Sequence, residues 1–309
     1  NSAGPLLLAG GGHSHALLLK RWAMQPRFRP DRMIVLINRC STSLYSGMVP
    51  GLIAGVYQRN ELAIDLRQLC DRAGVAFMAA EIQGLEPGQQ LLHLHGRPSL
   101  HYGWLSLDVG AISRTGAAGI PIKPLEPALA FLDQQLGSDP QPFRVIGAGA
   151  AGVEVVLALR RRWPQRPLQL QVRPGQLPDA LQHILQGAEV AVIQNEVPWE
   201  GPSLLCTGSR GPAWLANSGL PVNEHGRVQT DQYLQVKSTP RVFASGDCGV
   251  ISDAPRAASG VWAVRAARPL ATNLEAACQD KPPRPWQPQR QALQLIGTHQ
   301  DAAWARWGQ

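Results

Sequence analysis

A strand, a glycine turn and a helix are predicted in immediate succession at residues 5–20, and this segment constrains the fold more than any other. A run of leucines ends at Gly10-Gly11-Gly12, and the leucines that follow are spaced as on a helix lying against a sheet. Gly10 would bend the chain sharply, and Gly12 would let the backbone approach a pyrophosphate because it carries no Cβ. The first N–H groups of the helix would face that anion. His15 stands where this fingerprint usually has a small residue, so the turn alone is weak evidence.

A second copy of the pattern strengthens the interpretation. Residues 143–159 again contain a β-rich run and an apolar helix, joined by a complete G-x-G-x-x-G made of Gly147, Gly149 and Gly152. Two such units predict an α/β protein with two Rossmann-like dinucleotide-binding domains, each a three-layer ββα arrangement. They also predict two dinucleotide sites, one for non-covalent FAD and one for NAD(P)H as co-substrate.

The second domain is predicted to be inserted in the first and shortened. Its strands are expected at 190–194 and 203–206, and only residues 195–202 lie between them, whereas a three-stranded meander would need about 20 residues. The FAD-binding domain is therefore assigned to residues 1–113 plus 223–309, and the NAD(P)H-binding-like domain to residues 114–222.

The net charge of +7 raises the question of a nucleic-acid partner. The basic residues are mostly single, and the one run, Arg160-Arg161-Arg162, falls on a predicted helix and fits a solvated face. We therefore expect no nucleic-acid partner. No run approaches the ~18 apolar residues of a membrane span, and the amino terminus lacks the pattern of a signal peptide. Peripheral membrane contact is the most that we expect.

The five cysteines lack the close spacing of a redox disulfide, because no two of them form C-x-x-C or C-x-x-x-x-C. Scattered thiols of this kind fit a reducing, cytoplasmic setting. His13 and His15 could be imagined as metal ligands, but two histidines without a third ligand nearby rarely bind a metal, so we predict no metal site.

Three positions at the ends of predicted strands bear on the nucleotides. Asn38 stands where a Rossmann fold usually presents a carboxylate to the adenosine ribose, and we expect weaker ribose binding there or help from Arg39 stacked on adenine. Arg173 would favour a 2′-phosphate, hence NADPH, unless it simply starts a turn. Asp247 could bond a ribityl hydroxyl, and a plain Asx-turn is the alternative.

The two glycine units, Gly110 and VFASGD at residues 242–247 form a pattern that spans nearly the entire chain. In this pattern the chain resembles the pyridine nucleotide-disulfide oxidoreductase superfamily, in particular its type II NADH dehydrogenase-like branch. Four segments carry a narrower match: GGGHSH at residues 10–15, YSGMVPGLIAG at 45–55, LSLDVG at 105–110 and GVWAVR at 260–265. In these the chain is similar to the flavoprotein module found alone or fused ahead of selenide, water dikinase (selenophosphate synthetase).

This resemblance implies roles for individual residues but no catalytic side chain, since the cofactor carries the chemistry. For FAD it implies Gly10, Gly12, His13 and Ser14 at the pyrophosphate, Asn38, Arg39 and Ile82 at the adenosine, Ser46, Gly47, Met48 and Pro50 beside the isoalloxazine, and Gly110, Gly246, Asp247, Val261 and Trp262 around the ribityl chain and flavin. For NAD(P)H it implies Gly147, Gly149, Gly152 and Glu154, to which the strand pattern adds Arg173.

The resemblance also implies a function. We expect an FAD-dependent oxidoreductase that passes electrons from NAD(P)H through flavin to an unidentified acceptor: a quinone, a selenium or sulfur compound, or a protein. The alternative is a non-enzymatic FAD-binding redox or regulatory module of a selenide, water dikinase system for selenophosphate synthesis, which the short second domain would favour. The partners would be a small-molecule electron acceptor and a fused or associated selenophosphate synthetase domain.

Overall fold

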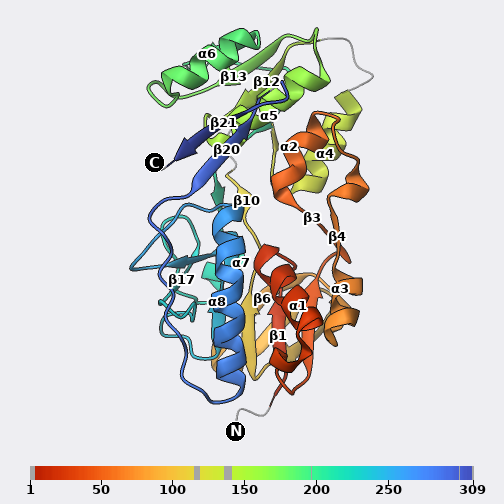
Figure 1. Ribbon diagram of the computed structural model, residues 1–309, viewed down its shortest axis with the longest axis vertical. Helices are drawn as coiled ribbons and strands as arrows, with labels where there is room; N and C mark the ends of the chain where they lie inside the picture. The colour runs from red at the N-terminus through yellow and green to blue at the C-terminus, as the bar shows by residue number, and fades with distance from the viewer. Residues whose placement is uncertain (1–3, 115–118, 136–140, 196, 299, 308–309) are drawn as a thin grey trace. The chain divides into compact units, whose positions relative to one another are not determined.

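The computed structural model describes residues 4–114, 119–135, 141–195, 197–298 and 300–307, and the chain separates into two compact units (Figure 1). Unit 1 comprises Asn1–Tyr45, Ala63–Ala111 and Arg210–Gln289, and unit 2 comprises Ser46–Leu62, Ile112–Ser209 and Arg290–Gln309. Each unit is built around its own parallel sheet.

The sheet of unit 1 has five parallel strands in the order β18-β9-β1-β2-β5. These strands are β1 (Leu6–Ala9), β2 (Ile34–Asn38), β5 (Ala76–Ala79), β9 (Trp104–Leu107) and β18 (Val242–Ala244). Strand β1 lies in the middle, with Leu6 paired to Ile34 on one side and to Trp104 on the other. All four residues of β1 are buried, as expected for a parallel strand covered on both faces.

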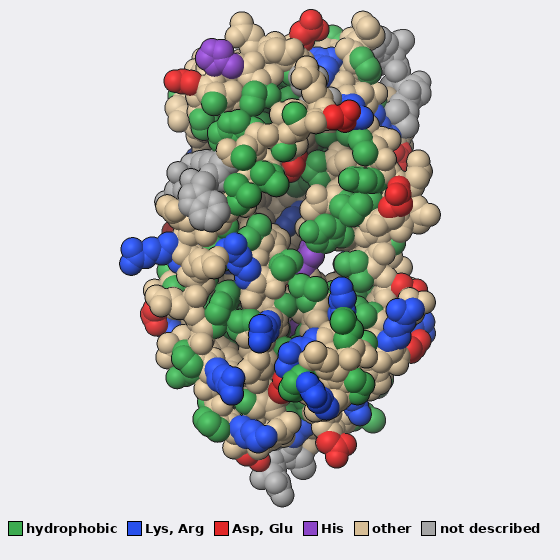
Figure 2. All heavy atoms as spheres, viewed as in Figure 1, with side chains coloured by type: hydrophobic (Ala, Val, Ile, Leu, Met, Phe, Trp, Pro, Cys, Tyr) green, Lys and Arg blue, Asp and Glu red, His purple; other side chains and the backbone are tan. Residues whose placement is uncertain are grey.

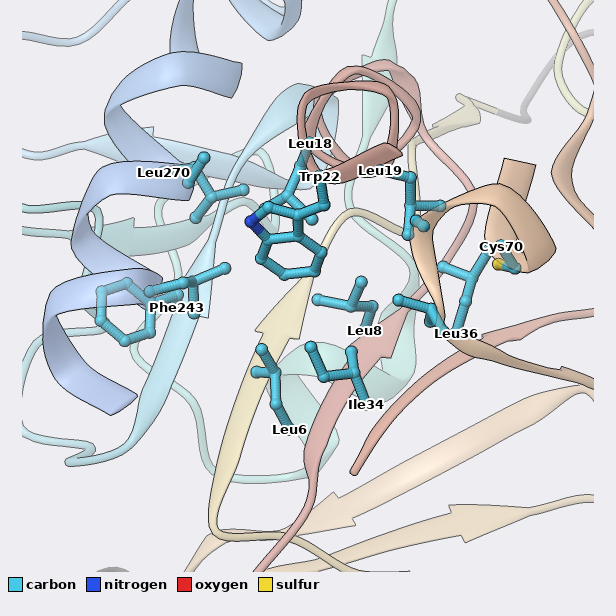
Figure 3. Packing of buried hydrophobic residues seen from close by; sticks show 14 of the residues in the cluster. Leu6, Leu8, Leu18, Leu19, Trp22, Ile34, Leu36, Cys70, Phe243 and Leu270 are labelled. Carbon is cyan, nitrogen blue, oxygen red and sulfur yellow. The ribbon is translucent and has the colours of Figure 1, made fainter. Parts of the chain in front are cut away.

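Helices cover one face of this sheet, namely α1 (His13–Met24), α3 (Leu66–Ala73) and α8 (Gly260–Cys278). Leu6 and Leu8 of β1 share one buried cluster with Trp22 of α1, as Figure 3 shows. Glu275 of α8 accepts hydrogen bonds from Trp22 Nε1 at 2.9 Å and from Arg21 Nε at 2.9 Å. This carboxylate joins α8 to α1, the helix that follows the first glycine turn.

An antiparallel meander covers the opposite face and completes three layers. It consists of β6 (Ile82–Glu86), β7 (Leu91–Leu94) and β8 (Arg97–His101). Leu7 and Ala9, the alternate residues of β1, point into this second cluster with Leu85, Leu92 and other apolar residues. The predicted three-layer unit is confirmed. Strand β8 was not predicted, because its residues are polar and mostly exposed and so show no apolar alternation.

Shorter elements complete unit 1. They are η1 (Pro26–Phe28), β3 (Thr42–Leu44) paired with β4 (Ala63–Asp65), η4 (Pro87–Gln89), α7 (Ala213–Asn217), β17 (Val228–Thr230) paired with β19 (Gly249–Ile251), and η6 (Gly246–Cys248). Strand β10 (Ile112–Ser113) and strand β16 (Ser209–Arg210) lie where the chain passes between the units.

Unit 2 repeats the same parallel core in the order β11-β15-β12-β13-β14. The strands are β11 (Ile120–Pro121), β12 (Phe143–Ile146), β13 (Leu168–Gln171), β14 (Val190–Ile193) and β15 (Ser203–Leu205). The helical segments are η2 (Ser46–Met48), α2 (Val49–Ile53), η3 (Arg59–Glu61), α4 (Leu125–Gln134), α5 (Ala150–Arg162) and α6 (Asp179–Gly187). A hairpin of β20 (Leu293–Gly297) and β21 (Ala303–Trp307) follows. Among the described residues between β14 and β15 no strand occurs, in agreement with the predicted shortening.

The unit boundaries differ from those expected. Residues 210–222 pack with unit 1, because Leu215 and Leu220 are buried in the cluster beneath the meander. Residues 46–62 belong to unit 2, where α2 packs on α5. The terminal hairpin also belongs to unit 2, and the Gly297 N–H donates to Glu154 on α5 at 3.0 Å. These side-chain contacts, which sequence order does not display, set the boundaries.

Two surface properties bear on the predicted partners. Figure 2 shows most of the visible Lys and Arg side chains in the lower half of the view, with uncharged side chains between them. Within the described ranges, no helix has both the length and the apolar character that a membrane crossing requires.

Candidate functional site

The first glycine turn connects β1 to α1, and Asp108 leaves no room for a side chain at either of its predicted key glycines. Gly10 has a φ of +94°, and a Cβ there would collide with the backbone carbonyl of Asp108. A Cβ on Gly12 would collide with the Asp108 carboxyl group. The sequence assigned the space beside Gly12 to a pyrophosphate, but in the structure the side chain of Asp108 already requires part of that space.

His15 occupies the third position of the fingerprint and is completely buried. Its Nδ1 lies 2.7 Å from the Gly10 carbonyl oxygen, and its Nε2 lies 2.8 Å from Ser106 Oγ. A carbonyl oxygen only accepts, so Nδ1 carries the proton and Nε2 accepts from the serine hydroxyl. Burial lowers the pKa of His15 to about 4, which keeps the ring neutral. The imidazole replaces the usual small residue by hydrogen-bonding to the turn and to β9.

Asp108 follows β9 directly, and its side chain closes the start of α1. Its Oδ2 accepts the His15 backbone N–H at 3.0 Å, so it supplies the helix cap that Gly12 cannot provide. Burial raises the pKa of Asp108 to about 6, and the negative charge of Asp247 acts in the same direction. The sequence interpretation did not single out Asp108 as a site residue. Its position at the carboxyl end of a parallel strand was the available signal.

Two predicted ligand residues beside the turn have protein partners. Ser14 Oγ donates to the Ala263 carbonyl of α8 at 2.8 Å. Asn38 Oδ1 accepts the Gly11 N–H at 3.0 Å, and its Nδ2 donates to the Cys40 carbonyl at 2.7 Å. Both side chains therefore hold the turn in place. Their predicted contacts with pyrophosphate and ribose stay predictions.

The remaining predicted groups of unit 1 lie at strand ends or exposed positions. His13 begins α1, and its ring lies edge-on to Tyr45 with centroids 5.3 Å apart. Arg39 is exposed immediately after β2, and Ile82 begins β6. Gly110 follows β9 with a φ of +70°, and a Cβ on it would meet nothing within 4 Å.

A second turn of unit 1 meets the first at Asp108. Gly246 follows β18 with a φ of +65°, and a Cβ on it would collide with the Asp108 carboxyl group. Arg227 holds this turn in place, because its buried guanidinium donates a hydrogen bond to the carbonyl of Asp247 at 3.0 Å. The structure thus brings the predicted residues Gly12 and Gly246 against one carboxylate.

The start of α8 and a small cavity adjoin this second turn. Trp262 lies in the first turn of α8 next to Val261, with the guanidinium of Arg265 5.2 Å from its ring centroid. Trp262 also lines the cavity with Ser245 and Gly246. Ser245 Oγ is buried and has no hydrogen-bond partner among the described residues, so it can bond to an added polar group.

The stretch predicted to lie beside a flavin ring belongs to unit 2. Ser46, Gly47 and Met48 form η2, and Pro50 lies in α2. The predicted flavin contacts of these four residues stay predictions.

The second glycine turn, between β12 and α5, differs in one respect from the first. A Cβ on Gly147 would collide with the Cys206 carbonyl, and one on Gly152 would collide with the Gly147 carbonyl. Gly149 is exposed, and a Cβ there would meet nothing within 4 Å. The fold itself therefore requires a small residue at Gly147 and Gly152 but not at Gly149, where open space remains for a ligand.

The two other predicted nucleotide residues of unit 2 lie in different surroundings. Glu154 Oε1 accepts the Gly297 N–H, and burial raises the pKa of this carboxyl. Arg173 is exposed just beyond β13. No group of three or more metal-ligating side chains occurs within the described parts of the chain.

Comparison with known proteins agrees with this architecture, although no family model matches the chain. The chain is 22% identical over 323 residues to the alternative NAD(P)H-ubiquinone oxidoreductase C1, chloroplastic/mitochondrial, of Arabidopsis thaliana. This match covers 80% of the chain and 61% of that relative, so the chain spans less than two thirds of the relative's length.

Solved structures match almost the whole chain. Reduced CoADR-RHD of Bacillus anthracis superimposes with a TM-score of 0.80 at 15% identity, over 95% of this chain and 60% of that one. The sulfide:quinone oxidoreductase of Aquifex aeolicus gives a TM-score of 0.79 at 16% identity, over 99% of this chain and 87% of that one. The chain therefore shares the fold of these two structures. The predicted fold class is confirmed.

Proposed function

We propose that the chain is a flavin-dependent NAD(P)H oxidoreductase, with FAD bound by unit 1 and NAD(P)H by unit 2. The observation that carries this proposal is the repetition of one design. In both units a central parallel strand, β1 or β12, passes through a glycine turn into a helix, α1 or α5. Such a turn and the following helix start form a dinucleotide site.

The residues of unit 1 fit the diphosphate and ribityl parts of FAD. The turn at Gly10–Gly12 leads into α1, and Asp247 lies just beyond β18, which is separated from β1 in the sheet by β9. Ser245 Oγ is buried and has no hydrogen-bond partner among the described residues. When bound, the flavin would accept electrons from reduced nicotinamide and pass them to a second substrate. The chain would contribute binding and orientation: the neutral His15 fixes the turn, and Arg227 fixes the loop that carries Asp247.

The cysteine nearest to this region is unsuited to redox exchange. Cys248 is buried, its thiol lies 3.2 Å from the Ser245 carbonyl oxygen, and burial raises its pKa to about 12. A thiol held in its protonated form is a poor nucleophile. We therefore propose that electrons leave the flavin directly for the acceptor rather than through a protein disulfide.

A quinone is the first acceptor to test, because the names of the Arabidopsis relative and of the Aquifex structure both contain one. A selenium or sulfur compound is the second, on the resemblance to the module fused to selenide, water dikinase. A fused or associated selenophosphate synthetase domain and a cytoplasmic location remain parts of the proposal. The free cysteines support that location.

The test is the spectrum of the purified protein and its response to nicotinamides. We expect a flavin band at about 450 nm after gentle purification or after incubation with FAD. Under anaerobic conditions NADH or NADPH should bleach this band, and a short-chain ubiquinone should restore it.

Two outcomes contradict the proposal in different ways. Protein that stays colourless after incubation with FAD would exclude the FAD site. Bound flavin that neither nicotinamide reduces would exclude the oxidoreductase and would instead fit a non-enzymatic FAD-binding module. Free FAD at the same concentration serves as the control for direct reduction.

A further inference from the structure

Asp108 lies where elements from three parts of unit 1 converge. The residue is 2% exposed. It accepts the His15 N–H at the start of α1, and it fills the space that a Cβ on Gly12 or on Gly246 would need. The protein therefore already places a carboxyl group at the helix start that the proposed function assigns to a diphosphate.

The ionisable groups around Asp108 come from two elements. His13 faces it from α1, where His15 donates its backbone N–H, and Asp247 and Cys248 face it from η6. His15 is neutral because burial lowers its pKa to about 4, and the Cys248 thiol is neutral because burial raises its pKa to about 12. His13 is the remaining group of this set that can carry a positive charge, and Asp247 carries a negative one.

We propose that Asp108 couples FAD binding to the uptake of one proton: its carboxyl group is protonated when the diphosphate occupies the turn. This inference rests on the proposed FAD site in unit 1. An ionised Asp108 and a diphosphate would place like charges around the same few N–H groups, with Asp247 adding a third acidic group. Like charges this close favour the protonated form of a carboxyl. The neutral carboxyl can still accept the His15 N–H and can donate its own proton to an acceptor.

Proton linkage has a defined pH dependence. In the free protein burial raises the pKa of Asp108 to about 6, so the group is ionised at neutral pH. Binding above about pH 6 must then take up a proton, and the dissociation constant of FAD should rise about tenfold per pH unit. Below about pH 6 the group is already protonated, and the dependence should level off.

The direct measurement is calorimetric titration of the apoprotein with FAD at pH 7.5 in two buffers that differ in ionisation enthalpy. Wild-type protein should take up about one proton per FAD bound. The amide of Asp108→Asn keeps an oxygen that can accept the His15 N–H, but the side chain cannot ionise. This variant should therefore take up almost no protons on binding FAD, and it should bind FAD more tightly than the wild type at pH 7.5. His13→Gln removes the other titratable group of the turn and leaves Asp108. It should bind FAD more weakly, because His13 is a predicted pyrophosphate contact, but the proton uptake per FAD bound should persist.

The outcomes separate this inference from the proposed function. FAD binding without proton uptake by the wild type, or uptake that persists in Asp108→Asn and disappears in His13→Gln, would overturn the inference alone. No FAD binding at any pH between 5.5 and 8 (roughly the window around the Asp108 transition) would overturn both. Should Asp108→Asn fail to fold, the wild-type proton count and the His13→Gln count still decide the matter.

Discussion

Gly149→Ala tests the nucleotide site of unit 2 with little disturbance to the fold. Gly149 precedes α5 with φ −65° and ψ 167°, a conformation that alanine adopts readily. The added Cβ would meet nothing within 4 Å. We therefore expect the free energy of unfolding to change by no more than about 0.5 kcal/mol.

The same methyl group should weaken nucleotide binding substantially. The proposed pyrophosphate lies against this turn, and an extra methyl in a close contact typically costs about 1–3 kcal/mol. That range corresponds to a dissociation constant for NADH or NADPH raised by roughly 5–150-fold. The assay is the rate of anaerobic flavin reduction as a function of nicotinamide concentration, with urea unfolding measured in parallel.

Two other glycines of unit 2 serve as comparisons. Gly187 ends α6, and a Cβ there also meets nothing within 4 Å, so Gly187→Ala should leave both stability and nicotinamide affinity nearly unchanged. Gly152→Ala should destabilise unit 2, because its Cβ would collide with the Gly147 carbonyl. If Gly149→Ala were reduced by NADH and NADPH with wild-type concentration dependence, the assignment of this turn to a nucleotide would be wrong.

Three further predictions concern unit 1. Glu275→Ala should lower the free energy of unfolding, measured in urea, by roughly 3 kcal/mol, because it leaves the buried Trp22 Nε1 and the Arg21 guanidinium without their acceptor. Asp253→Ala, which removes an exposed carboxylate, is the control and should change the free energy of unfolding little. Gly12→Ala should destabilise the folded protein by about 1–3 kcal/mol, because the added Cβ collides with the Asp108 carboxyl group. In a double-mutant cycle, Asp108→Ser should relieve part of this loss, and additive effects of the two substitutions on stability would contradict the contact. Burial lowers the pKa of His15 to about 4 in the folded protein, whereas the ordinary value is 6.5. The free energy of unfolding should therefore fall by up to ~3 kcal/mol as the pH is lowered from 6.5 to 4. The stability of His15→Gln relative to wild type should rise over the same window, and a constant difference would count against a buried neutral ring.

Much of the architecture could be predicted because it depends on local sequence patterns. Both glycine turns join a strand to a helix as expected. Strand β8 could not be predicted, because its exposed, polar residues obtain their conformation from pairing with β7. The same holds for residues 46–62, whose place in unit 2 depends on packing against α5.

The candidate site was predicted less completely than the fold. Gly12 and Ser14 lie at the first turn and Asn38 ends β2, as the strand and turn pattern predicted, and the side chains of Ser14 and Asn38 hydrogen-bond to protein groups. Their contacts with FAD stay predictions. Asp108 lies in the LSLDVG segment but was missed as a site residue, because its importance comes from contacts with residues far away in sequence. His15 was recognised as a departure from the fingerprint, and only its two hydrogen bonds explain how the turn accommodates it.

The sequence by itself determined the two strand-turn-helix units, the shortened second domain and the absence of closely spaced cysteines, because each depends on residues near one another in the chain. The tertiary structure alone decided where the units divide, which glycines leave open space, and that a buried carboxylate caps α1. The physical reason is that charge, burial and steric room at a site are set by neighbours from distant segments. Asp108, brought by β9 to the start of α1, is the clearest case.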